Sequence, residues 1–242
     1  MKIVKYTKLK KNKYNILFDD NSAYDFYDDV ILKHGLLLKK ELTKEELESL
    51  IKENTEFDAF YVAVDYLNKK LRTKAEIIKY LNKKEYSTKD IDKTIKILEE
   101  RNLINDTFVA TCYMNDQINF NLKGPYKIKE ELEHLGVSKD IIDSVIDYHD
   151  ERYQENIKKI INKKVKTNHN YGKRMLINKI KNDLYNMGYR DIDNIDISYD
   201  DHDLLKKEYD KLLKKYQNHP NKDYIIKQKL YQKGYSIDNL DI

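Results

Sequence analysis

The sequence predicts a mainly α-helical chain: an elongated tandem array of three-helix repeats with a small N-terminal β-hairpin extension. The first observation is a helix-ending phrase that occurs four times, with Ile and Leu eight and four residues before an anchor. The anchors are Glu85, Gly136, Gly188 and Gly234, and their near-constant spacing indicates internal repetition. The second observation is that 242 residues include only six glycines and two prolines, which leaves little material for tight β-turns.

Residues 1–42 form the predicted N-terminal extension. Three short stretches in it are rich in β-branched and aromatic residues: 3–9, 14–18 and 23–27. Such stretches, separated by polar residues, predict a β-hairpin or a three-stranded sheet. A short helix is then expected within 27–38, ending near Gly35.

Residues 43–106 form the predicted first repeat with a lead-in helix. Two capping boxes, each a Thr followed three residues later by Glu, predict helix starts at Thr43 and Thr73. A separate helix is expected from about Phe57, where apolar residues recur at helical spacing. A third helix is expected to start at Ser87.

Two further segments complete the predicted array. The second repeat is 107–153, with a middle helix within 123–136 and a last helix capped by Ser138. The segment 154–242 holds the third repeat and a truncated repeat. Each repeat has an apolar face that only a neighbouring repeat can cover, so the repeats are expected to stack.

Composition limits the class of protein. Charged residues make up 36% of the chain and mean hydropathy is −0.83, with no apolar run near the ~20 residues of a membrane span. The basic start lacks the apolar segment of a signal peptide. A single cysteine, Cys112, fits a reducing compartment and is expected to be a buried thiol. We therefore expect a cytoplasmic monomer with no membrane association.

Positive charge gathers in two blocks. Residues 66–84 carry seven basic side chains against one Glu, and 152–181 carry ten against one Glu, followed by six aspartates in 191–203. Such blocks indicate a polyanionic partner or a charge-matched protein surface, and the alternative is a solvated helix exterior. The candidate binding residues are Lys69, Lys70, Arg72, Lys74, Lys158, Lys159, Lys163, Lys164, Lys173, Arg174 and Lys179.

No motif indicates catalysis. Neither a glycine-rich phosphate loop nor a His/Cys metal-ligand spacing is present, and the aspartate-rich segment lacks the glycine that a calcium loop requires. We expect no catalytic residue, metal or cofactor. The chain has 21 tyrosines, and those that recur at helix ends, such as Tyr86, Tyr189 and Tyr235, are interpreted as packing residues rather than base-stacking platforms.

Three stretches together resemble the RecX family of bacterial recombination regulators: 65–86, 97–106 and 124–137, which read DYLNKKLRTKAEIIKYLNKKEY, ILEERNLIND and GPYKIKEELEHLGV. The N-terminal extension is similar to that of the low-GC Gram-positive members. The resemblance implies a curved array of three three-helix repeats that binds the RecA–DNA filament and restrains the ATPase, strand-exchange and co-protease activities of RecA. The chain departs from the family pattern at Glu85, at 105–110 and at Lys127, which puts individual RecA contacts in doubt.

Three hypotheses follow. The first is a modulator of the RecA filament that acts by contacting the filament. It would take part in the SOS response and in DNA repair. The second is a DNA-binding helical repeat protein without RecA specificity, with weak, salt-dependent affinity for single- or double-stranded DNA. The third is an enzyme such as a nuclease, which would need a carboxylate cluster that the sequence does not indicate.

Overall fold

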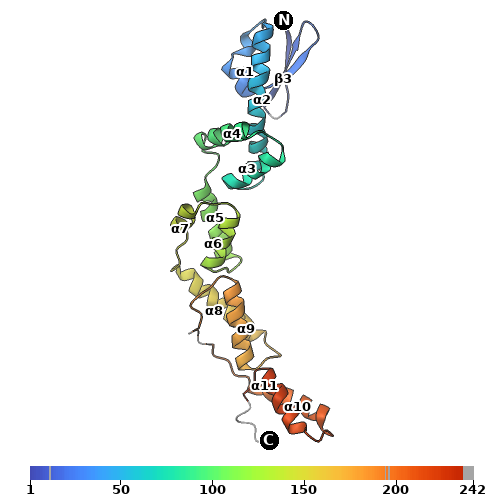
Figure 1. The fold of residues 1–242 in the computed structure, drawn as a ribbon, viewed down its shortest axis with the longest axis vertical. Helices are drawn as coiled ribbons and strands as arrows, with labels where there is room; N and C mark the ends of the chain where they lie inside the picture. Colours follow the sequence, from blue (N-terminus) through green and yellow to red (C-terminus); the bar gives the residue numbers. More distant parts are fainter. Residues whose placement is uncertain (11, 194, 196, 237–242) are drawn as a thin grey trace. The chain divides into compact units, whose positions relative to one another are not determined.

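The computed structural model describes residues 1–10, 12–193, 195 and 197–236, and the chain divides into two compact units, Met1–Val109 and Ala110–Ile242 (Figure 1). The N-terminal unit contains β1 (Ile3–Lys8), β2 (Lys13–Phe18), β3 (Ala23–Tyr27), α1 (Asp28–Lys33), the 3-10 turn η1 (Leu36–Leu38), α2 (Lys44–Leu67), α3 (Lys74–Lys83) and α4 (Thr88–Glu100). Helix α5 (Asp106–Asn119) begins in this unit and continues into the C-terminal one, whose other helices are α6 (Pro125–His134), α7 (Lys139–Val145), α8 (Glu151–Lys166), α9 (Lys173–Asn186), α10 (His202–Tyr216) and α11 (Lys222–Gln232). The predicted mainly α fold with a small N-terminal sheet is confirmed.

The N-terminal extension is a three-stranded antiparallel sheet in the order β1–β2–β3. Alternate residues of a strand face the same side, so Ile16 and Phe18 of β2 point together into a core. Val30 and Ile31 of α1 close this core together with the start of α2. The predicted stop at Gly35 is confirmed, because that glycine has the left-handed φ of 57° after α1.

Helix α2 is one continuous helix of 24 residues, so the separate helix expected from Phe57 is wrong. The residues of α2 before Phe57, 44–56, include neither Gly nor Pro, and nothing there ends the helix. Its two halves serve different cores. Leu47 and Leu50 pack in the core of the sheet and α1, whereas Phe60 and Ala63 pack with α3 and α4.

The predicted helix starts depend on local hydrogen bonds. At Thr43 and Thr73 both halves of the capping box are formed, and the Ser87 hydroxyl accepts a bond from the Asp90 amide. Ser138 stands at the N-cap of α7, but its side chain makes no capping bond. The three confirmed caps show that these starts are set by neighbours in the sequence.

All four anchors of the repeated phrase end a helix in the left-handed conformation. The φ angles are 66° at Glu85, 76° at Gly136, 89° at Gly188 and 90° at Gly234. In every copy, the backbone amide of the residue after the anchor donates a hydrogen bond of 3.0–3.3 Å. Its acceptor is the carbonyl oxygen of the Leu that lies four residues before the anchor. This is the Schellman ending, and the predicted left-handed stops at Gly188 and Gly234 are confirmed.

The middle helices of the C-terminal unit dock end to end through glycines. The Gly124 amide donates to Met187 O at 2.7 Å and the Tyr126 amide to Gly188 O at 3.2 Å, which joins the start of α6 to the end of α9. The same pair of bonds joins the start of α9, at Gly172, to the end of α11. A Cβ on Gly124 would lie 2.5 Å from Gly188 O, so this contact requires a residue without a side chain.

The third repeat contains a non-helical segment after α9. Among the described residues of 187–201 no helix is formed, although Tyr189, Ile192 and Ile197 are buried in the core of the C-terminal unit. An extended segment therefore covers the apolar face where a third helix of this repeat is expected.

Deleting residues 1–35 is expected to leave most of the helical circular dichroism signal. The core around Phe60 and Ile77 shares only Phe57, at its edge, with the core of the sheet. The deletion removes the cover of Leu47 and Leu50, so the first turns of α2 should fray and the melting temperature should fall. A truncated chain without a cooperative thermal transition would contradict this expectation.

Candidate polyanion-binding surface

The four predicted site residues of the first block are mostly paired in the N-terminal unit. Lys74 Nζ lies 2.7 Å from Glu99 Oε1, and Lys70 Nζ lies 3.8 Å from Glu76 Oε1. Lys69 is exposed and has no ion pair with a described residue. Paired charges are less available to a partner, so Lys69 is the free member of the predicted residues in this block. Lys79, Lys83 and Lys84, which were not predicted, are also exposed and have no ion pair with a described residue.

Arg72 is a packing residue. Its guanidinium lies 4.2 Å from the centre of the Tyr66 ring, which stacks on Tyr80 at 3.9 Å. Its Nη1 donates to Glu76 Oε1 at 2.9 Å, and the side chain is only 15% exposed. A buried, stacked guanidinium holds the loop between α2 and α3 in place.

Helix α8 presents the larger free positive surface. Its buried side consists of Tyr153, Asn156, Ile157 and Ile160. We define the α8 lysine face as the exposed lysines on its other side: Lys158, Lys159, Lys163 and Lys166. Only Lys159 has an ion pair among the described residues, a 3.9 Å contact with Glu155. Lys166 was not among the predicted site residues, although its place on this face could have been found from the helical spacing.

The other predicted residues of the second block have partners. Lys164 Nζ lies 2.5 Å from Asp183 on α9. The Arg174 guanidinium stacks at 3.9 Å on Tyr231 and donates to Tyr231 O, and Lys179 Nζ lies 4.5 Å from the centre of the Tyr171 ring. These contacts stabilise the fold of the third and last repeats. Lys173 has an exposed side chain, while its amide donates to Asp201 at 2.6 Å.

The aspartates of 191–203 do not neutralise the basic block in the described part of the chain. No side-chain ion pair joins them to its lysines; Lys181 Nζ instead donates to the carbonyl oxygen of Asp193. Asp196, one of the six, lies outside the described residues. The α8 lysine face therefore keeps its charge.

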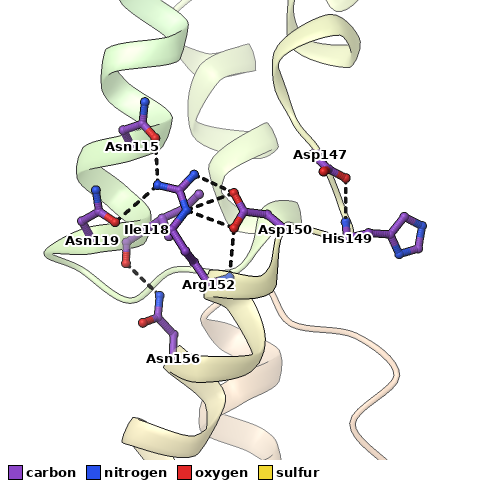
Figure 2. A network of polar contacts seen from close by, with 8 residues as sticks. All are labelled: Asn115, Ile118, Asn119, Asp147, His149, Asp150, Arg152 and Asn156. Atoms are coloured by element: carbon purple, nitrogen blue, oxygen red, sulfur yellow. Dashed lines mark hydrogen bonds and ion pairs between the residues drawn. The ribbon is translucent and has the colours of Figure 1, made fainter.

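A polar network that the sequence did not indicate holds α8 against α5 (Figure 2). The Arg152 guanidinium donates to both carboxylate oxygens of Asp150, at 2.6–3.0 Å, and to Asn115 Oδ1 at 2.9 Å. Asp150 also caps α8 by accepting the Arg152 amide, and the buried Asn156 donates to Ile118 O at 2.8 Å. This network orients the helix that carries the lysine face.

Asp150→Asn is expected to lower the stability of the C-terminal unit at neutral pH by about 1–2 kcal/mol, since the charge-assisted pair with Arg152 is lost while the Asn side chain can still cap α8. Hydrogen bonds from Arg152 hold the pKa of Asp150 below its usual range. The carboxylate thus stabilises the fold above the unfolded-state pKa of about 3.9, and this contribution is lost as pH falls through the lower folded-state pKa. Urea unfolding at neutral and acidic pH measures both effects.

Asp147→Asn is the matched control for that variant. Asp147 lies three residues earlier and is exposed, and its carboxylate accepts a hydrogen bond from the His149 amide at 2.9 Å. The Asp147→Asn substitution removes the same charge as Asp150→Asn and leaves the contacts of Arg152 unchanged. An equal loss of stability in the two variants would show that the network does not contribute as described.

Other kinds of site find little support in the described residues. No group of three His, Cys, Asp or Glu side chains there is placed to hold a metal ion. None of the described helices combines the length and apolar character that a membrane span needs.

Comparison with known proteins gives a consistent result. Residues 59–98 match the family model for the first three-helix domain of RecX. Curated relatives called "Regulatory protein RecX" include one from Listeria monocytogenes serotype 4a, 34% identical over 99% of this chain and 94% of that protein. Another, from Oceanobacillus iheyensis, is 30% identical over 99% of this chain and 96% of that protein.

Solved structures agree with the fold. A crystal structure of regulatory protein RecX covers 78% of this chain and 94% of its own, with a TM-score of 0.64 and 27% identity. The structure of RecX from Lactobacillus salivarius covers 73% of this chain and 97% of its own, with a TM-score of 0.53. At 24% identity the second likeness concerns the fold alone.

Proposed function

The chain belongs to the RecX family of regulatory proteins, and from that premise we propose that it regulates homologous recombination by binding the RecA–DNA filament. The observation that carries the proposal is the similarity over nearly the full chain, at 34% identity, to regulatory proteins of that family. Bound to the filament, the protein lowers RecA ATPase, strand-exchange and co-protease activity. It acts in the cytoplasm as a monomer, without a cofactor.

The α8 lysine face supports this proposal. A RecA–DNA filament presents DNA phosphates and acidic side chains, and unpaired lysines on a rigid helix attract such charges. Lys158, Lys163 and Lys166 have no ion pair with described residues, so contact with the filament need not break one. Lys69 and Lys173 are the remaining free members of the predicted set.

The direct test is RecA ATPase on single-stranded DNA, titrated with this protein. We expect ATP hydrolysis to fall as the protein is added and the inhibition to weaken as salt rises. Unchanged hydrolysis at saturating protein would refute the proposal.

A second candidate is a nucleic-acid-binding protein without RecA specificity, which the free lysines also favour. Such a protein would lower ATPase only by competing for DNA, so additional single-stranded DNA would restore hydrolysis. Inhibition that persists in excess DNA supports contact with the filament. Magnesium-dependent cleavage of DNA by the pure protein would instead indicate a nuclease.

A further inference from the structure

Helix α10 carries a dense set of lysines that lies outside the predicted blocks. Its apolar residues, among them Leu205, Tyr209 and Leu212, pack against α11 in the last hydrophobic cluster of the described chain. We define the α10 lysine face as the exposed lysines of this helix: Lys206, Lys207, Lys211, Lys214 and Lys215. Lys207, Lys211 and Lys214 are spaced by four and three residues, so they project from the same side.

These lysines have no ion pair with any described carboxylate. Asp203 and Asp210 lie on the same helix and are exposed, yet neither lies within ion-pair distance of a lysine in the described chain. Lys207, Asp210, Lys211, Lys214 and Lys215 line a shallow groove of about 610 Å³. Five closely spaced positive charges against two negative ones repel one another unless an anion lies between them.

The residue types on this face favour one class of partner. Protein interfaces are depleted in lysine at their centre and depend on aromatic or large apolar anchors. The exposed side of α10 has no such anchor, because the large apolar residues of this helix are buried or partly buried against α11. Lysine as a mobile point charge suits phosphate, which it neutralises without needing a fixed geometry.

We propose that the α10 lysine face binds the phosphate backbone of DNA. Contacts of this kind position a protein on the backbone and do not distinguish base sequences, since every nucleotide carries the same phosphate. The inference deepens the proposed function, because it assigns DNA binding to a surface separate from the α8 lysine face. It rests on the proposed function only for its biological setting. Its test omits RecA, so the two can fail separately.

The experiment is a fluorescence anisotropy titration of labelled oligothymidylate with the full chain at several salt concentrations. The variant Lys207→Gln/Lys211→Gln/Lys214→Gln removes three contacts. We expect weaker binding at low salt and a slope of log K against log salt that is shallower by about 2, since each phosphate contact on a single strand contributes about 0.7.

The matched control is Lys44→Gln/Lys89→Gln/Lys139→Gln. These lysines are exposed, have no ion pair with described residues and lie on three different helices, so the net charge changes equally without touching a cluster. Circular dichroism checks that both variants are folded. Equal slopes in the two variants would overturn the proposal. Unchanged DNA binding by the α10 variant would overturn it in favour of an acidic protein surface.

Discussion

Gly188→Val is expected to destabilise the C-terminal unit by roughly 3 kcal/mol or more, a larger effect than that of Asp150→Asn. Gly188 has a φ of 89°, which a β-branched residue adopts only with strain. A Cβ there would also lie 2.2 Å from the Lys127 amide nitrogen, so α9 would have to move away from α6. Urea unfolding followed by circular dichroism measures the loss.

Three further variants separate the causes. Gly35→Ala places a side chain in left-handed backbone with nothing within 4 Å, so it reports conformational strain alone. Gly124→Ala has ordinary φ and a Cβ 2.5 Å from Gly188 O, so it reports the steric clash alone. Glu85→Val tests a position that already holds a side chain at a φ of 66°. If Gly188→Val cost no more than Gly35→Ala and Glu85→Val, the docking of α9 on α6 would not need a glycine.

Reversing Lys158, Lys163 and Lys166 to Glu is expected to raise the protein concentration needed to inhibit RecA ATPase by about tenfold or more. The three reversals change the charge of one helix face by six units, which turns attraction to a polyanion into repulsion. None of the three lysines has an ion pair with a described residue, so no ion pair is lost. Thermal unfolding should therefore change little. Undiminished inhibition at low salt would place the binding surface elsewhere, and the lysines of 69–84 would be tested next.

Reversing four of the candidates that the sequence predicts, Lys163, Lys164, Lys173 and Arg174, is a poorer test. Lys164 is paired with Asp183 and Arg174 stacks on Tyr231, so reversing all four would also disturb packing. Reversal of Lys10, Lys11 and Lys13 in the N-terminal β segment would be a poor control for the same reason. Lys13 lies 4.2 Å from the centre of the Tyr27 ring, and Lys11 lies outside the described residues. Reversal of Lys44, Lys89 and Lys139 is the better control.

Local features of the fold could be predicted from the sequence. The capping boxes at Thr43 and Thr73 and the left-handed stops at Gly188 and Gly234 are formed as predicted. Each depends on hydrogen bonds between residues three to five positions apart, so the interacting groups are visible in one short stretch of sequence. The mainly α class follows from these features because they recur along the chain.

The continuity of α2 could not be predicted from such local features. The sequence shows two apolar patterns, one around Leu47 and one from Phe57, and a change of pattern resembles a change of helix. Only the packing decides that one helix serves two cores, since the sheet and α1 cover its first half while α3 and α4 cover its second.

The sequence by itself determined where most helices begin and end and that positive charge is concentrated in blocks. The tertiary structure decided which of those charges are free. Lys164 pairs with Asp183 on the next helix and Arg174 stacks on Tyr231 of α11. The α8 and α10 lysine faces, in contrast, have no described carboxylate within ion-pair distance, except at Lys159. Charge pairing is decided by distance in space, and helices that lie far apart in the sequence come within 4 Å only after the repeats have stacked.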